Sequence, residues 1–376
     1  MNMLNLIKKN RINLSLRSQL KIVLSLVLTV AYCSAALSAT VIQNGRGLVG
    51  VMNETYSTAL TGTTTNEIGF APYAYINMIF YNEGSNCRVE AGLLMEIDGV
   101  KGVKFNTAGT LMLVPEVTYI DNRTWDNGSS SDTVTAMFNG YGTNTNQNLG
   151  YESGCMWFPN QSTPNNGIDA NVNVTHRVTA TGRVLIYGTG TQQSGSGSLT
   201  YPFKLMLRNP RSPGPYPSGI LVNAGSYSVL VTNLGCTLTT PTLVEFGPQP
   251  ANATANQALA SKTVNLSVSC QQSQNPISAT LTLLAGINPT YYSGDNYQVN
   301  LNNSSGIAGA YVKMDMDING ASIAIPFNRQ FIDIGNITAA ENATSFSYPV
   351  TYTLYSRGAG ITGKVSGSVE LSLVLR

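Results

Sequence analysis

The stretch Ile168-Asp-Ala-Asn-Val-Asn-Val-Thr-His-Arg-Val-Thr-Ala180 decides the fold class of this chain. Its even-numbered positions are apolar except for His176, and all its odd-numbered positions are polar. Such alternation is typical of a half-buried β-strand, because successive side chains of a strand point to opposite faces. The sequence therefore predicts a strand over residues 168–180.

Two-residue turns separate further alternating runs. The pairs are Leu93–Ile97 with Val100–Phe105 around Asp98-Gly99, and Val312–Ile318 with Ala321–Ile325 around Asn319-Gly320. Asp-Gly and Asn-Gly favour tight hairpins because both residues tolerate positive φ. No ten-residue stretch after the N-terminal segment combines a helical period with caps. We predict an all-β chain of two antiparallel β-sandwich domains.

The composition supports strands with an uncharged polar surface. Of 376 residues, 21 are Lys or Arg and 19 are Asp or Glu, so 11% are charged, against about 25% in an average protein. The hydrophobic content of 43% excludes charge-driven disorder. A net charge of +2 is too small to indicate a nucleic-acid partner.

Residues 1–39 have the order of a secretory signal peptide. Basic residues come first, namely Lys8, Lys9, Arg11, Arg17 and Lys21, without any acidic residue. The apolar run 22–31 and the small residues of 33–39 follow. We expect cleavage after Ala39, with Ala36 as an alternative, since the apolar run is shorter than the roughly 20 residues of a membrane span. Removing 1–39 leaves 16 basic and 19 acidic residues, a net charge of −3.

Four cysteines remain after the signal peptide. They are Cys87, Cys155, Cys236 and Cys270. An even number in an exported chain predicts two disulfides, and three pairings are open. We favour Cys87–Cys155 and Cys236–Cys270, which place one bridge in each half. A zinc site is disfavoured because no Cys-x-x-Cys occurs.

A cluster of turn-forming residues, Asn209–Gly219, indicates a domain boundary. We predict a first domain over residues 40–222, a linker over 223–235 and a second domain over 236–376.

Catalytic motifs are weak. His176 is the single histidine and shares an apolar strand face, and no Gly-x-Ser-x-Gly occurs. Asp315 to Gly320 resembles the start of a calcium loop, but the twelfth position is Pro326 where such a loop needs Glu. We expect no enzyme, no metal and no cofactor; a secreted hydrolase is the weaker alternative.

The second domain contains four distinctive segments in a fixed order: Cys236–Gly247, Val264–Cys270, Phe346–Tyr352 and the alternating Gly363–Arg376. In this order of segments it resembles the pilin domain of Gram-negative chaperone–usher fimbriae. The family usually has Tyr next to last, where this chain has Leu375. A strand-rich domain before the pilin domain is similar to the two-domain tip adhesins of such fimbriae.

This resemblance implies an incomplete immunoglobulin-like sandwich that a donor strand from the next subunit completes. The terminal strand would line the acceptor groove with Gly363, Val365, Gly367, Val369, Leu371, Leu373, Leu375 and Arg376. The implied partners are a periplasmic chaperone, an outer-membrane usher and the next fimbrial subunit. The implied route runs through the periplasm to the tip of a surface fimbria.

By the same resemblance, the first domain looks like a lectin domain, although no sugar-binding motif of the family matches it residue by residue. Sugar sites pair an aromatic face with carboxylate or amide groups. Two loop-like stretches offer both, and their candidate residues are Trp125, Asp126, Asn127, Trp157 and Asn160. Tyr141 and Tyr151 are weaker candidates, and Trp157 could instead pack beside Cys155. We predict attachment to a host glycan or glycoprotein; the alternative is a tip or cap subunit that binds a protein receptor or has only a structural role.

Overall fold

Strands dominate the described part of the chain, as the alternation predicts. The computed structural model describes residues 39–376 except 66–72, 79–90, 106–107, 127–130, 146–150, 154–155, 159–171, 209–216, 274–275 and 359. Within these residues, only the short 3₁₀ turns η1 (Ala91–Leu93) and η2 (Pro289–Tyr291) are helical. The predicted all-β class is confirmed. No helix among the described residues is both long and apolar enough to span a bilayer.

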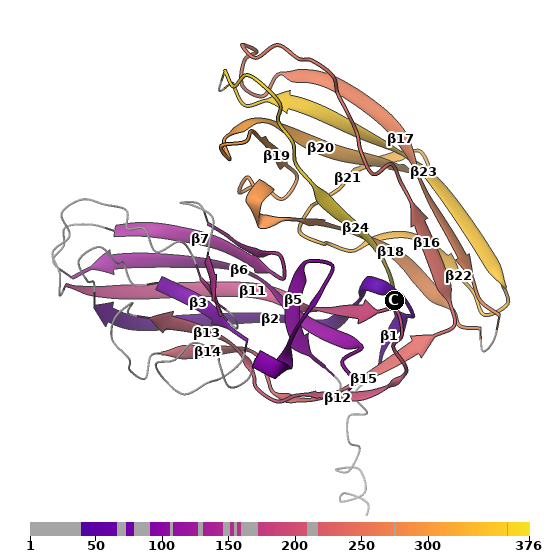
Figure 1. Cartoon of the computed structure of the whole chain (residues 1–376), viewed down its shortest axis with the longest axis horizontal. Coiled ribbons are helices and arrows are strands. Elements are labelled where there is room, and N and C mark those ends of the chain that lie inside the picture. Colours follow the sequence, from indigo (N-terminus) through magenta and orange to yellow (C-terminus); the bar gives the residue numbers. More distant parts are fainter. Residues whose placement is uncertain are drawn as a thin grey trace, which may run out of the picture. The chain divides into compact units, whose positions relative to one another are not determined.

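The N-terminal half, strands β1 to β15, contains three sheets (Figure 1). One sheet has the order β1 (Thr40–Gln43), β15 (Gly225–Thr232) and β12 (Gly195–Leu199). A second has β14 (Ser218–Val222), β13 (Phe203–Arg208), β3 (Tyr73–Asn77), β10 (Met156–Phe158) and β9 (Tyr151–Ser153). The third has β2 (Arg46–Thr65), β11 (Asn173–Thr189), β6 (Leu111–Trp125), β5 (Val100–Lys104) and β4 (Leu94–Ile97), with β7 (Ser131–Asn139) and β8 (Gly142–Thr145) attached beside β6.

One apolar core holds these three sheets together. Buried side chains come from each of them, for example Ile42 of β1, Ile76 of β3 and Val178 of β11. Such burial stabilises by about 25 cal/mol per Å² of apolar surface removed from water.

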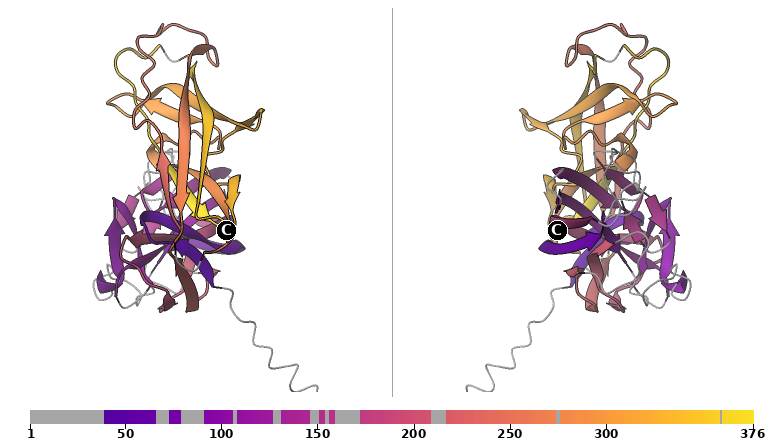
Figure 2. Two further views of the ribbon diagram at one scale, coloured as in Figure 1. Left: turned by 90° about the vertical axis from the view of Figure 1, so that its right-hand side faces the viewer. Right: turned by 90° about the vertical axis from the view of Figure 1, so that its left-hand side faces the viewer.

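The C-terminal half, strands β16 to β24, is a two-sheet sandwich (Figure 1 and Figure 2). Its larger sheet has β16 (Gly235–Thr239), β17 (Ala258–Gln271), β23 (Ala343–Ser356), β20 (Ala308–Ile318) and β19 (Val299–Asn302), with β21 (Ala321–Ala324) beside β20. Its smaller sheet has β22 (Ile332–Ile337), β18 (Ala279–Ile287) and β24 (Val369–Leu375). A second apolar core, with Leu266, Met316 and Leu373, lies between the two sheets.

The strand order of this half is that of an immunoglobulin-like domain. Such a domain pairs strands A-B-E-D in one sheet and C-F-G in the other. Here β16-β17-β23-β20 occupy the A-B-E-D positions, and β18-β24 occupy C and F. Among the described residues, no strand pairs with β24 in the position of G.

Both predicted hairpins are present. Asp98 and Gly99 have φ of 53° and 79°, and Asn319 and Gly320 have φ of 54° and 82°. Each turn joins directly paired strands, β4 to β5 and β20 to β21. Asp317 accepts a hydrogen bond from the Gly320 amide at 2.8 Å, so this carboxylate stabilises the turn.

The alternation within 168–180 is seen over its described part. In β11 the even positions from Val174 to Ala180 are buried and the odd ones are exposed or half-buried. The strand continues to Thr189, and residues 168–171 lie outside the described residues.

The described residues test the remaining predictions only in part. The Cys236–Cys270 disulfide is confirmed, whereas Cys87, Cys155 and residues 1–38 lie outside the described residues. Residues 223–235, the expected linker, include strand β15. The division into domains 40–222 and 236–376 stays a prediction.

Candidate functional site

The unpaired edge of β24 is the main candidate site of the C-terminal half. Thr280 and Arg376 exchange both main-chain hydrogen bonds, at 2.8 and 3.0 Å. Antiparallel neighbours alternate between bonded and non-bonded pairs. The main-chain N–H and C=O groups of Leu371, Leu373 and Leu375 therefore point away from β18, toward the free edge.

The side chains of these three leucines pack into the core of the C-terminal half. Leu373 and Leu375 are buried there, and Leu371 and Val369 are partly buried against the same cluster. Val374, on the opposite face of β24, packs into the core of the N-terminal half. The free edge thus borders an apolar interior, which is the arrangement that adds a strand from another chain.

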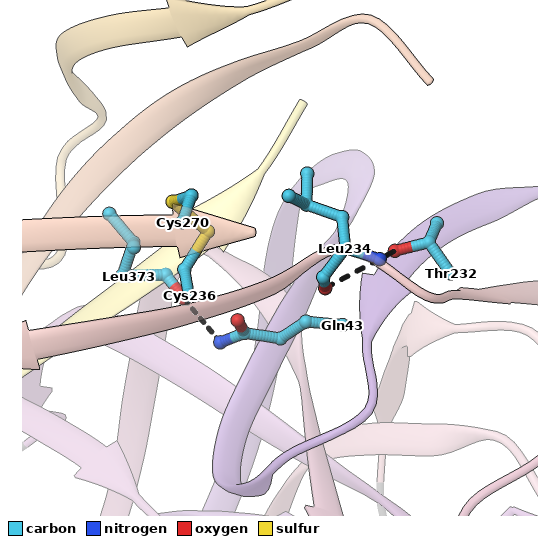
Figure 3. The surroundings of a disulfide bond; sticks show 6 residues. All are labelled: Gln43, Thr232, Leu234, Cys236, Cys270 and Leu373. Carbon is cyan, nitrogen blue, oxygen red and sulfur yellow. Dashed lines mark hydrogen bonds between the residues drawn. A yellow bond between two sulfur atoms is a disulfide. The ribbon is translucent and has the colours of Figure 1, made fainter. Parts of the chain in front are cut away.

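Strand β16 provides a second edge over the same core. It pairs only with β17 among the described strands, and Cys236 and Leu238 pack against the core. The disulfide joins directly opposed residues of β16 and β17 (Figure 3). The Gln43 side-chain amide donates to the Leu373 carbonyl at 3.0 Å (Figure 3), so one carbonyl of the β24 edge already has a partner.

The remaining predicted groove residues lie before or after β24. Val365 and Gly367 precede the strand, which is shorter than the alternation of 363–376 suggests because Ser366 instead bridges to Asn302 of β19. Gly363 has φ of +95°, the left-handed region that favours glycine. Arg376 follows β24. Its guanidinium carbon lies 4.6 Å from the centre of the Phe331 ring, and its Nη1 lies 3.5 Å from Asp333 Oδ1.

The predicted sugar-binding residues are only partly described. Trp125 is the last residue of β6 and is 2% exposed, with the Arg123 guanidinium 5.3 Å from its ring centre. Asp126 is exposed and accepts a hydrogen bond from Thr175 at 3.4 Å. Trp157 lies in β10. Asn127 and Asn160 lie outside the described residues.

The interior of the N-terminal half holds polar groups that the sequence did not predict together. His176 bonds through Nδ1 to Asp121 and through Nε2 to Thr64, at 2.8 Å in each case. Hydroxyl, imidazole and carboxylate stand in the order of a hydrolytic triad. All three residues are buried, with His176 at 0% exposure, so no substrate reaches them in this conformation. Asp121 Oδ1 has no hydrogen-bond partner among the described residues.

A hollow of about 460 Å³ is lined by residues of β2, β6, β7 and β11 and by Asn328 and Gln330 of the C-terminal half. Hydroxyl groups line it, from Thr55, Ser57, Thr118 and Thr181. Its two charged groups, Glu116 and Arg183, pair with each other at 3.0 Å. The hollow therefore offers hydrogen bonds to an uncharged ligand. Among the described residues, no His, Cys, Asp and Glu side chains gather in threes as a metal site would require.

Fold and edge define the class: an all-β chain with a sandwich of immunoglobulin order, whose last strand pairs on one side only among the described strands. No protein-family model and no curated protein matches the chain. Similar solved structures include a chaperone–tip adhesin complex of CFA/I fimbriae, with 11% identity, 89% of this chain and 94% of that chain covered, and a TM-score of 0.25. The CsuC–CsuE chaperone–tip subunit complex of Acinetobacter baumannii has 12% identity, coverage of 83% and 91%, and a TM-score of 0.21. The CupB6 tip adhesin of Pseudomonas aeruginosa has 12% identity, coverage of 90% and 92%, and a TM-score of 0.24.

Proposed function

We propose that the chain is the tip adhesin of a chaperone–usher fimbria. A periplasmic chaperone and then the next subunit add a strand to the free edge of β24, and the usher assembles the subunit at the cell surface. The main observation in support of this proposal is the unpaired edge of β24 beside an apolar core, in a sandwich that lacks a strand at the G position among the described residues.

The strand-addition step is tested by removing one edge amide. Leu371→Pro deletes an N–H that points away from β18, so it leaves the β18–β24 hydrogen bonds in place. Ser322→Pro is the matched control. In a two-residue hairpin the residues flanking the turn form a bonded pair, so the next residue, Ser322, directs its N–H to the free edge of β21.

We expect a co-expressed periplasmic fimbrial chaperone to co-purify with the wild-type chain and with Ser322→Pro. Capture by Leu371→Pro and by a chain truncated before Gly363 should be lost. Equal capture of all four proteins would contradict strand addition at β24.

The N-terminal half is proposed to bind a host glycan or glycoprotein. Two surfaces support this: the exposed Asp126, which follows β6 and precedes the predicted Asn127 in the sequence, and the hydroxyl-lined hollow. Carboxylate and hydroxyl groups are suited to the hydroxyl groups of a sugar. We expect no enzymatic activity.

A glycan array probed with the whole chain tests this part. Asp126→Ala and Thr118→Ala each alter one of the two surfaces, so the variant that loses binding identifies the surface used. If the wild-type chain binds no glycan, the glycan proposal is wrong and the protein-receptor or cap function takes its place.

A further inference from the structure

A single buried arginine connects the C-terminal strand to the N-terminal half. Arg329 follows β21 in the C-terminal half and its side chain is 1% exposed. Its Nη1 pairs with Glu116 of β6, and its Nη2 pairs with Glu370 of β24 at 2.6 Å. Nη2 also lies 3.4 Å from the Tyr187 hydroxyl of β11. The guanidinium therefore contacts strands from both halves.

This centre is electrically balanced. A buried charge is costly unless it is paired and hydrogen-bonded. Arg329 and Arg183 face Glu116 and Glu370, so two positive charges meet two negative ones. Burial alone would lower the pKa of Arg329, but Glu116, Tyr187 and Glu370 raise it well above its usual range. The guanidinium stays charged and keeps both carboxylates paired.

The backbone around Arg329 is shaped to receive it. The Arg329 amide donates to the Ala285 carbonyl of β18 at 2.8 Å. A Cβ at Gly286 would lie 2.5 Å from Arg329 Nε, so the guanidinium lies where only glycine leaves room. Gly286 is directly opposite Glu370 in the β18–β24 ladder. Arg329 itself has φ of +54°, an unfavourable conformation for a side-chain-bearing residue, which its contacts hold in place.

Two tyrosines of the N-terminal half approach the same carboxylate of β24. The Tyr187 hydroxyl donates to Glu370 at 3.3 Å. Burial, and after it the nearby Glu370, raise the pKa of the Tyr141 hydroxyl, between β7 and β8, to about 12. Glu370 lies on the face of β24 opposite the leucines that line the core. The strand is thus bonded to β18 along one edge, and its Glu370 side chain is held from the N-terminal half.

We propose that Arg329 is a positioning residue: it anchors β24 to Glu116 of the N-terminal half and so keeps the free edge ordered for strand addition. An edge strand with a ladder on one side only opens more readily than a central one. The anchor replaces part of the restraint that a partner strand would supply. That an ordered edge helps the chain to bind a chaperone or the next subunit rests on the proposed function. The contact of Arg329 with Glu116 and Glu370 does not depend on it.

Hydrogen exchange of the β24 amides in the whole chain, measured without any partner, tests the anchor. Arg329→Met should increase exchange across β24 by about tenfold or more, because it leaves Glu370 without an ion-pair partner and removes the link to Glu116, which keeps only Arg183. Glu116→Gln, far from β24 in sequence and in the other half, should also increase it. Arg357→Met is the matched control: Arg357 is in the same half, but it bonds to Asn300 and stacks on Tyr311. It should leave β24 exchange unchanged.

Unchanged exchange in Glu116→Gln and Glu370→Gln would overturn the proposal, and these two variants decide it even if Arg329→Met fails to fold. An increase in Glu370→Gln alone would show that the order of β24 does not depend on Glu116, and would overturn the proposal as well. Chaperone capture is measured in parallel. It should fall in Arg329→Met and recover in part in Arg329→Lys, which keeps the charge but cannot bridge two carboxylates as well. Failure of the wild-type chain to capture chaperone would contradict the proposed function, while the exchange result would still decide the anchor.

Discussion

Loss of the Cys236–Cys270 disulfide should destabilise the C-terminal half strongly. The bridge joins opposed residues of β16 and β17 (Figure 3), and β16 is an edge strand among the described strands of this sandwich. The cysteines are 34 residues apart. In the chain-entropy model, a loop of this length corresponds to a loss of about 3.8 kcal/mol when the bridge is removed. At roughly 2–4 °C per kcal/mol, the melting temperature should fall by about 8–15 °C.

Differential scanning calorimetry of Cys236→Ala/Cys270→Ala measures this change. Reduction of the wild-type chain is unsuitable as a control because other cysteines would also react. The matched control is Thr263→Ala/Thr351→Ala, a hydroxyl pair at 2.8 Å across β17 and β23. An exposed cross-strand pair contributes about 0.2–1 kcal/mol, so this control should change the melting temperature by only a few degrees. A disulfide variant that melts within about 3 °C of wild type would refute the argument from loop closure.

Three further changes have defined outcomes. Gly367→Ala should destabilise by about 1–3 kcal/mol in urea unfolding, because the added Cβ would lie 2.5 Å from the Asn300 carbonyl oxygen; an unchanged midpoint would contradict this. Burial and the nearby Glu370 raise the pKa of Tyr141 to about 12. The unfolded chain therefore loses this proton first, and stability should fall as pH rises from about 10 to about 12; in an ultraviolet titration, Tyr141→Phe should remove a late-titrating group. His176→Leu should cost about 1–3 kcal/mol, measured by the denaturant midpoint, because Asp121 loses its hydrogen bond in the interior; a neutral result would show that the pair is dispensable.

Local patterns predicted the strands well because strand alternation and turn geometry are local properties. The run ending at Ala180 and the turns at Asp98-Gly99 and Asn319-Gly320 each carry their signal within a few residues. The Cys236–Cys270 pair was also predictable once the cysteines were assigned to separate halves.

The buried polar groups were not predictable, since their partners lie on other strands. Trp125 precedes a polar stretch and was expected in an exposed loop, but β6 continues to it and its odd positions face inward. Two of those inward positions, Asp121 and Arg123, are charged, which hid the alternation. Their partners, His176 and Asp132, belong to other strands. Arg329 likewise has no local signal, because Glu116 is 213 residues away in sequence.

The low charge of the chain corresponds to uncharged polar contacts on the solvent faces of its strands. On the solvent face of β17 and β23, hydroxyl pairs such as Ser261–Thr353 and Ser267–Ser347 take the place of ion pairs. Soluble proteins often protect a sheet edge with a charged side chain or a proline. Strand β24, Val-Glu-Leu-Ser-Leu-Val-Leu, has one charged residue, Glu370, and Arg329 holds it on the side of the N-terminal half. No charge of β24 therefore opposes pairing at its free edge. The contact with Arg329 thus places Glu370 where its charge would not oppose the proposed addition of a strand at β24.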